Sequence, residues 1–147
     1  MTTVGQILAR KTTQIHSVSP DHTVLDALKL MAGKDISAVL VIEGERLVGI
    51  FTERDYARKV ILQGRSSRES RIGELMSQNL LTVSPTQTVE EIMAIMTENR
   101  FRHLPVVDHG QLVGIVTIGD TVKAMLDQQQ QTIRQLSGYI AGDLSAS

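Results

Sequence analysis

Two copies of a Thr-x-x-Asp motif carry the side chains in this sequence that are best suited to chemistry. Thr52 and Asp55 lie in the stretch LVGIFTERD, and Thr117 and Asp120 lie in LVGIVTIGD. At a helix start, the threonine hydroxyl accepts a hydrogen bond from the backbone and the acid bonds back, which forms a capping box. An aspartate at such a place can also accept hydrogen bonds from ribose hydroxyls. The motif is compatible with a helix cap alone and with nucleotide binding.

Two further boxes show that this motif does not identify a binding site by itself. Thr23 with Asp26, and Thr88 with Glu91, have the same form at the start of other predicted helices. The LVGI-containing copies differ because each follows a glycine-containing apolar strand, and ligands of α/β proteins bind at the carboxyl ends of strands. A helix N-terminus there also offers free N–H groups to a phosphate.

Basic side chains near the second copy would complement a phosphate. The stretch NRFRHLPVV supplies Arg102 and His103 directly before an apolar strand. Because side chains alternate along a strand, at least one of the two is expected to face a cleft. The first half has Ser37 at the place of Arg102, and its further candidate cation is Arg54. The two sites are therefore predicted to differ in how they hold a phosphate.

No catalytic or metal-binding motif accompanies these residues. The sequence lacks the GxxxxGK[ST], GxGxxG, HExxH and GxSxG patterns. It also has no cysteine, and its four histidines show no metal-ligand spacing. A net charge of −1 and an aromatic content of 3% argue against nucleic-acid binding, and no apolar run is long enough to span a bilayer. We expect a cytoplasmic protein that is not an enzyme and has no metal, nucleic-acid or membrane partner.

The elements that position the motifs occur twice. Residues 18–58 align without a gap with residues 83–123, an offset of 83 − 18 = 65, and 13 of the 41 pairs are identical. Each repeat predicts an extended piece, a helix with apolar residues at helical spacing, a hairpin and a second helix. The extended pieces are predicted at Gln14–Val18 and Leu80–Val83. The lead-ins VGQIL and IGELM, which precede the repeats, also correspond.

The predicted fold is mixed α/β (α+β). Two β-α-β-β-α repeats are expected to pack as a pseudo-twofold pair, because one copy is too small to bury its own faces well. We place the repeats at 4–63 and 72–126, with a polar linker at 64–71 between them. The second helix of the first repeat is expected to end at Gly64, since glycine favours a helix C-terminus.

A helical arm is predicted at 127–147, outside both repeats. Ile133, Leu136 and Ile140 follow one another at i, i+3 and i+7, which indicates a narrow apolar stripe. The stripe is compatible with packing on the arm's own body and with contact to a second subunit. We favour the second interpretation because the stripe lies outside both repeats.

Over about residues 4–126 the sequence resembles a tandem cystathionine-β-synthase (CBS) domain pair, or Bateman module, similar to stand-alone bacterial pairs. The resemblance lies in an apolar strand followed by LVGI-x-T-x-x-D, a layout that occurs twice at this spacing, as VLVIE…LVGIFTERD and as LPVVD…LVGIVTIGD. It implies two clefts between the repeats that bind adenosine-containing ligands such as AMP, ADP, ATP or NAD, with no catalytic cofactor. It also implies that each cleft combines the ribose-binding aspartate of one repeat with the strand entrance of the other.

The resemblance assigns two sets of ligand-binding residues, one for each cleft. The first is Thr52, Arg54, Asp55, Asn79, Phe101 and Arg102, and the second is Thr13, Ile36, Ser37, Arg102, His103, Thr117 and Asp120. The implied function is a regulatory sensor that forms a homodimer and signals nucleotide occupancy to an unidentified protein. The alternative is a structural dimerisation module with no physiological ligand.

Overall fold

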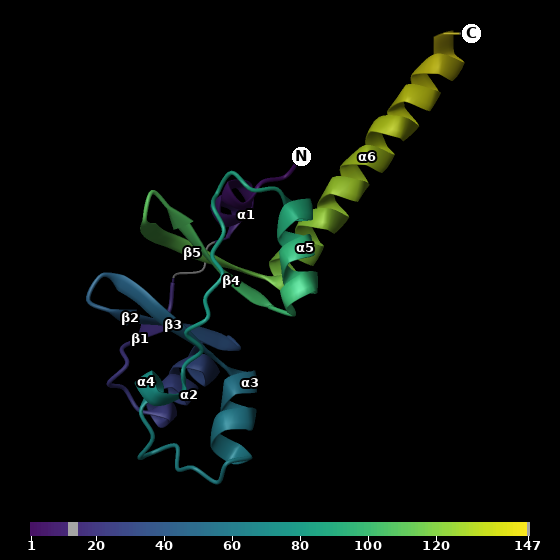
Figure 1. Ribbon diagram of the computed structural model, residues 1–147. Helices are drawn as coiled ribbons and strands as arrows, with labels where there is room; N and C mark the ends of the chain where they lie inside the picture. Colours follow the sequence, from purple (N-terminus) through teal and green to yellow (C-terminus); the bar gives the residue numbers. More distant parts are fainter. Residues whose placement is uncertain (12–14, 147) are drawn as a thin grey trace. The chain divides into compact units, whose positions relative to one another are not determined.

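The computed structural model describes residues 1–11 and 15–146, with side chains described as far as residue 140 (Figure 1). The chain forms two compact units. We name them by their place in the sequence: the outer unit combines Met1–Thr12 with Thr82–Ser147, and the central unit is Thr13–Leu81. Each lead-in thus belongs to the unit that contains the body of the other repeat.

The central unit is built around a small mixed sheet. Its elements in chain order are β1 (Ser17–Val18), α2 (Val24–Lys34), β2 (Ala38–Glu43), β3 (Arg46–Thr52), α3 (Glu53–Asp55), the π-helix η1 (Tyr56–Ile61) and α4 (Ile72–Leu75). Strand β2 pairs in parallel with β1 and antiparallel with β3. Val24, Phe51, Val60 and Ile72 are fully buried in its core, so the helices and the sheet share one apolar interior.

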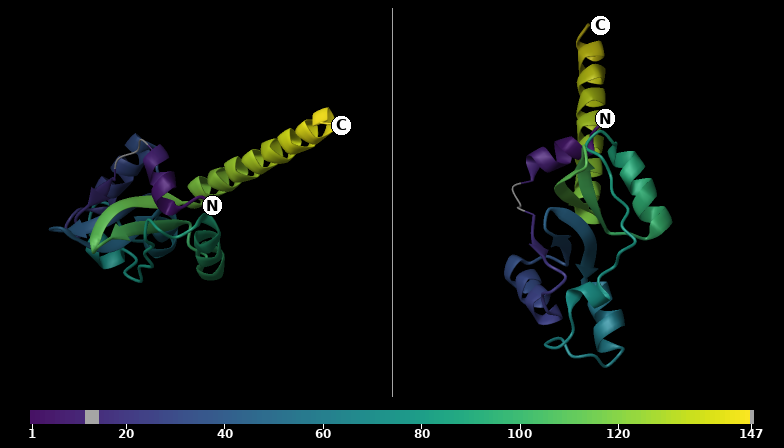
Figure 2. Two further views of the ribbon diagram at one scale, coloured as in Figure 1. Left: turned by 90° about the horizontal axis from the view of Figure 1, so that it is seen from above. Right: turned by 60° about the vertical axis from the view of Figure 1, so that its left-hand side comes forward.

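The outer unit repeats this plan around a hairpin. Its elements are α1 (Val4–Arg10), α5 (Val89–Asn99), β4 (His103–Asp108), β5 (Gln111–Thr117) and α6 (Ile118–Ala146). Helix α5 lies beside the first turns of α6, and the rest of α6 extends away from the unit (Figures 1 and 2). Val4, Ile92, Leu104 and Val116 are fully buried in the core.

The two hairpins have the same register. Each contains one irregularity, between Val41 and Ile42 in the first hairpin and between Val106 and Val107 in the second. These positions are related by the sequence offset of 65, so the hairpins predicted in both repeats are confirmed. The second strand of each hairpin runs directly into the helix that carries the aspartate of interest.

The first strand differs between the repeats. The N–H of Leu40 donates to the carbonyl oxygen of His16 at 3.2 Å, next to the ladder of β1 and β2. Pro105 occupies the corresponding place in the second repeat, and proline has no N–H to donate. The predicted extended piece at Leu80–Val83 therefore pairs with β4 through an isolated bridge at Val83, where the first repeat has the short strand β1.

Glycines fix two features of the helices and strands. Gly64, with a φ of +64°, donates to Ile61 at 3.2 Å while the next N–H, of Arg65, donates to Val60 at 2.9 Å. This pattern is a Schellman motif and confirms the predicted helix end at Gly64. Gly49 of the first LVGI stretch leaves room for Met76 of the lead-in, because a Cβ at this position would lie 2.6 Å from Met76 Sδ.

The second helix of repeat two and the predicted arm form one continuous helix, α6. All side chains at 131–140 are exposed, so this part of the arm does not pack on its own unit. Of the two interpretations of the apolar stripe, packing against its own unit is therefore not observed for the described residues.

Candidate functional site

Both LVGI-containing capping boxes form at the junction of a strand and a helix. In the central unit, Thr52 Oγ1 accepts from the N–H of Asp55 at 3.1 Å, and the Thr52 N–H donates to Asp55 Oδ2 at 3.0 Å. In the outer unit the corresponding distances for Thr117 and Asp120 are 3.1 and 2.9 Å. Each aspartate is therefore fixed at a helix start, with its carboxylate held next to the end of a hairpin.

The Asp120 carboxylate is paired with a lysine from the first lead-in. Lys11 Nζ donates to Asp120 Oδ2 at 2.7 Å and to the carbonyl oxygen of Ile115 at 2.9 Å. Burial raises the pKa of Asp120, but the hydrogen bonds from Lys11 and Thr117 and the charge of Lys11 outweigh it. The pKa is thereby lowered below its ordinary value of 3.8, and the carboxylate is ionised at neutral pH.

The backbones of Arg102 and His103 lie at the end of the hairpin from which the Asp120 helix starts. His103 pairs with Thr117 across the hairpin, and the carbonyl oxygen of Arg102 accepts from the N–H of Ile118 at 2.9 Å. Burial lowers the pKa of His103, the charges of Arg102 and Lys11 lower it further, and Asp120 acts in the opposite direction. At neutral pH the site therefore contains a neutral imidazole among charged groups.

The Asp55 carboxylate is contacted at both of its oxygens. Ser77 Oγ donates to Asp55 Oδ1 at 2.9 Å, and Lys59 Nζ lies 3.2 Å from the same oxygen. The N–H and hydroxyl of Thr52 both donate to Oδ2. The Asp55 side chain is 10% exposed, against 22% for Asp120. Donors contact both oxygens of Asp55, whereas Lys11 and the Thr117 N–H both contact Oδ2 of Asp120.

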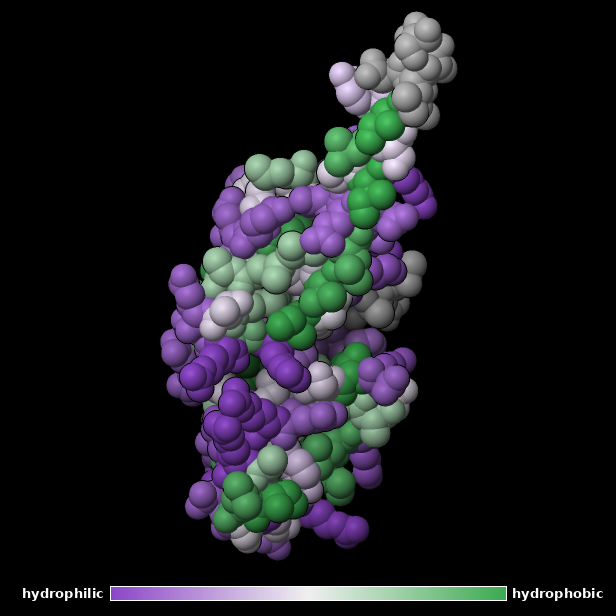
Figure 3. All heavy atoms as spheres, turned by 90° about the vertical axis from the view of Figure 1, so that its right-hand side faces the viewer, coloured by the Kyte–Doolittle hydropathy of each residue, from purple (hydrophilic) through white to green (hydrophobic). Residues whose placement is uncertain are grey.

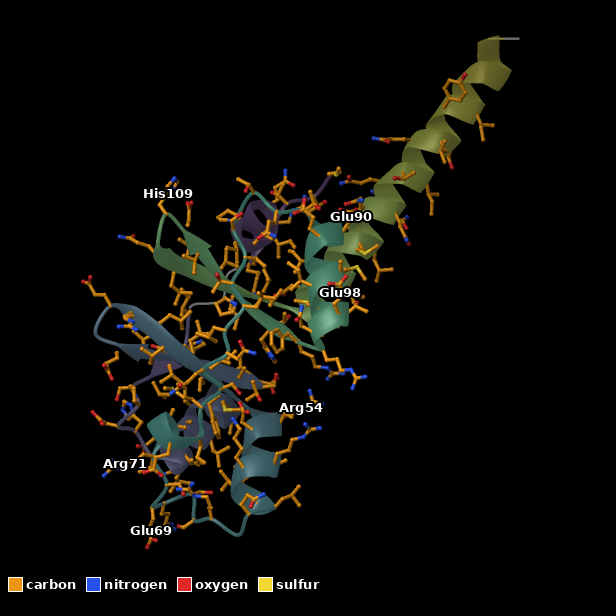
Figure 4. The ribbon with its side chains drawn as sticks, in the orientation of Figure 1. Arg54, Glu69, Arg71, Glu90, Glu98 and His109 are labelled. Atoms are coloured by element: carbon orange, nitrogen blue, oxygen red, sulfur yellow. The ribbon has the colours of Figure 1, made fainter. Side chains whose placement is uncertain are left out.

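The remaining predicted site residues are distributed over both units. In the central unit, Ser37 accepts a backbone hydrogen bond from Glu53 at 3.0 Å, and Ile36 packs against the core. Arg54, on α3 (Figure 4), is exposed, as is Asn79. Phe101 packs against the core of the outer unit and Thr13 lies outside the described residues. The structure groups Arg102, His103, Thr117 and Asp120 in one unit and Ile36, Ser37, Thr52, Arg54, Asp55 and Asn79 in the other.

Three residues around the carboxylates were not singled out from the sequence. Lys59 lies four residues after Asp55, and this i, i+4 spacing on a helix is a recognisable signal for an ion pair. Lys11 and Ser77 follow the two lead-ins and carry no comparable local signal. Their roles depend on which repeat body each lead-in packs with, and this is a long-range feature of the fold.

Comparisons with known proteins agree with this arrangement. The model of the family described as "CBS domain" matches twice, at residues 4–61 and 72–127. The chain belongs to the CBS domain family. The tandem repeat and the α/β fold with a C-terminal helix are thereby confirmed, and the repeats can be called CBS1 and CBS2.

Several CBS-domain proteins are similar over most of this chain. CBS domain-containing protein CBSX3, mitochondrial, of Arabidopsis thaliana is 42% identical over 127 residues, which are 83% of this chain and 62% of that protein. The chain thus spans less than two thirds of that relative. A putative signal-transduction protein with CBS domains from Burkholderia ambifaria MC40-6 has a TM-score of 0.84 and 50% identity, and the match covers 87% of this chain and 96% of that one.

A third CBS-domain protein was solved with a nucleotide. The structure of CBSX2 in complex with AMP has a TM-score of 0.73 and 30% identity to this chain. The match covers 88% of this chain and 99% of that one. AMP is therefore a ligand of a protein that shares the fold of this CBS pair over most of its length.

Two further classes of feature were sought in the described part of the chain. At residues 1–11 and 15–146, no three histidine, cysteine, aspartate or glutamate side chains gather as a metal site would require. No helix within these ranges combines the length and the apolar character needed to cross a membrane.

Proposed function

We propose that this CBS pair is a non-catalytic regulatory module that binds an adenine nucleotide, AMP, ADP, ATP or NAD, at Asp120. The observation that carries the proposal is the state of this carboxylate. It is ionised, partly buried and fixed by a capping box, and Lys11 and the Thr117 N–H both donate to its Oδ2. CBS-pair proteins are regulatory modules, and the complex of CBSX2 with AMP supports the choice of ligand.

The proposed ribose site uses the two oxygens of Asp120 differently. Oδ2 maintains the helix cap with the Thr117 N–H, whereas Oδ1 accepts from a ribose hydroxyl. The ammonium group of Lys11 and the guanidinium group of Arg102 supply positive charge for the phosphates, because His103 is neutral at neutral pH.

The proposal gives Asp55 a weaker role in binding. A ribose there must compete with Ser77 and Lys59, which already contact Oδ1, and with Thr52, which donates twice to Oδ2. With Thr52, Arg54 and Asn79, Asp55 forms a second proposed site, for which we expect a lower affinity than for the Asp120 site. Its main contribution is then structural.

Nucleotide binding at Asp120 has a route to the rest of the protein. Lys11 joins the end of the α1 lead-in to Asp120 and to the backbone of β5. A nucleotide whose phosphate attracts Lys11 changes these contacts, and a ligand shifts an equilibrium between conformations by its differential affinity for them. We propose that an unidentified protein, or the dimer contacts of the pair, respond to this change.

Isothermal titration calorimetry of the full chain with AMP, ATP and NAD tests the proposal. We expect Asp120→Asn to weaken binding of the best ligand by about 5- to 150-fold, as for a lost charged hydrogen bond of about 1–3 kcal/mol. Asp55→Asn should weaken it less. Asp26→Asn is the matched control, because Asp26 forms a capping box at the start of α2 and belongs to neither proposed site.

Two outcomes would contradict the proposal. If none of the three nucleotides binds or stabilises the wild-type chain at millimolar concentration, the alternative of a structural dimerisation module is favoured. If Asp120→Asn and Asp26→Asn bind equally well, the ribose assignment is wrong even though a nucleotide binds.

A further inference from the structure

Helix α6 carries a stripe of large apolar side chains that its own unit does not cover. The stripe, here called the α6 seam, consists of Val122, Leu126, Gln129, Ile133, Leu136 and Ile140. Its five apolar members are between 46% and 61% exposed. Figure 3 shows apolar side chains in a band along this helix. At about 1.5 Å per residue the seam is roughly 27 Å long.

The seam is a different face from the one that packs on the outer unit. Thr121 and Ala124 are buried, Met125 packs against the core, and Gln128 hydrogen-bonds with Glu90 at 2.8 Å. With 3.6 residues per turn, these positions centre about a quarter-turn or slightly more away from the seam. The seam is therefore not an extension of the core-facing stripe, and it requires a separate explanation.

As far as its side chains are described, the distal part of α6 does not pack against its own unit. Every side chain from 129 to 140 is exposed. Most helical stability in proteins comes from packing of an apolar face, and helical segments of this length are marginal in water without it. A second surface that covers the seam would supply this packing.

We propose that the α6 seam packs against the α6 seam of a second copy of this chain, and that the two helices form a parallel two-stranded coiled coil. The alternating spacing of four and three residues is that of heptad positions a and d. Ile133 and Ile140 then occupy a positions and Leu136 a d position. Isoleucine at a with leucine at d favours two parallel strands over three or four.

Gln129 argues for the parallel arrangement. In a parallel coiled coil this d-position amide lies opposite the same amide of the second copy, and the two can hydrogen-bond to each other. In an antiparallel arrangement, a positions oppose d positions, so the amide would face an apolar side chain such as Ile133. A buried polar group without a partner is destabilising, and a single polar residue in a seam commonly fixes register.

The charges beside the seam are compatible with a second copy. The flanking e and g positions are Lys123, Met125, Gln130, Thr132, Ser137 and Tyr139, and from residue 125 to 140 none of them is charged. Two copies therefore meet without like-charge repulsion along this stretch. A different protein recognised through e and g charges would need charged residues there. The charged Asp127 and Arg134 lie at b positions, away from the seam.

Cysteine cross-linking tests the parallel register directly, because the native sequence contains no cysteine. Under mild oxidation we expect Gln129→Cys to form a disulfide-linked dimer of the full chain. The matched control, Gln131→Cys, lies at an outward f position and should remain largely monomeric on a non-reducing gel. Equal cross-linking of the two variants, or none at Gln129→Cys, would overturn the proposal.

Analytical ultracentrifugation of the full chain tests the energetic role of the seam. Leu136→Lys should raise the dissociation constant of the dimer by at least about tenfold, since it places like charges in an apolar seam. Gln131→Lys adds the same charge at the outward f position and should change it little. A wild-type chain that is monomeric at tens of micromolar, or an unchanged constant for Leu136→Lys, would show that the inference is wrong. Neither result depends on nucleotide binding.

Discussion

The two units hold equivalent aspartates by different means. In the central unit, Ser77 donates its N–H to the carbonyl oxygen of Ile50 at 2.8 Å and its hydroxyl to the carboxylate at 2.9 Å. In the outer unit, the ammonium group of Lys11 contacts both the carbonyl oxygen of Ile115 and the carboxylate. Both arrangements join a lead-in, the last part of a strand and an acid, but only the outer one does so with a charge.

Replacements within the repeats explain this difference. When VGQIL is aligned with IGELM, Ala9 stands at the place of Ser77 and has no hydroxyl to donate. Four residues after its aspartate, the central unit has Lys59, whereas the outer unit has the buried Ala124. Each acid has one lysine, supplied by the following helix in the central unit and by Lys11 of the lead-in in the outer unit. A ligand that draws a lysine away would therefore affect a lead-in only in the outer unit.

The largest expected effect is a difference in stability between alanine variants of the two aspartates. Asp55→Ala should lower the free energy of unfolding by about 2–4 kcal/mol, because it leaves Ser77 and Lys59 without a shared acceptor and removes a helix cap. Asp120→Ala should cost about 1–2 kcal/mol, because fewer donors depend on that carboxylate. Urea denaturation monitored by circular dichroism measures both values. Equal losses would show that the difference in hydrogen bonding has no energetic consequence.

The LVGI glycines provide a second contrast. A Cβ at Gly49 would lie 2.6 Å from Met76 Sδ and 3.1 Å from the backbone oxygen of Ser77. A Cβ at Gly114 would meet only the flexible end of Leu8, at 2.8 Å. We expect Gly49→Ala to cost about 1–3 kcal/mol of stability, as for overpacking, and Gly114→Ala to cost about 1 kcal/mol or less.

Thermal unfolding of the two alanine variants in parallel tests this contrast. The backbone of Ser77 is hydrogen-bonded to Ile50 in both directions, at 2.8 and 3.0 Å, and therefore cannot move aside without breaking these bonds. A larger destabilisation by Gly114→Ala would contradict this account and would indicate that the α1 lead-in is the more rigid of the two.

Local patterns in the sequence predicted much of this fold. The hairpins, the helix ends and the capping boxes depend on residues a few positions apart, such as Thr52 with Asp55. Pro105 also indicates that the extended piece at Leu80–Val83 pairs with β4 over a short length only, because proline lacks the N–H that Leu40 donates in the first repeat. The Lys11–Asp120 pair is different, since it joins residues 109 positions apart. To predict this pair, one must know which repeat body each lead-in packs against. Helical or strand periodicity does not carry that information.

The smallest expected effect is a dependence of stability on pH that comes from His103. It concerns only the outer unit, because Ala38 stands at the place of His103 in the central unit. The pKa of His103 is lowered from its ordinary value of 6.5, chiefly by burial and then by Arg102 and Lys11. Just below pH 6.5 the unfolded chain therefore binds a proton that the folded chain does not, and stability decreases as the pH falls. The decrease stops once the pH is below the lowered pKa of the folded state.

Urea denaturation at about pH 7.5, 6 and 5 measures this contribution, which we expect to be about 1 kcal/mol or less. His103→Gln should flatten the dependence between about pH 7 and 5. For comparison, His109→Gln removes a histidine of the exposed β4–β5 turn (Figure 4), outside this cluster. The lowered pKa of Asp120 acts separately, since its stabilisation is lost only as the pH falls below about 4. Retention of the full dependence in His103→Gln would mean that the acid-sensitive group lies outside this cluster.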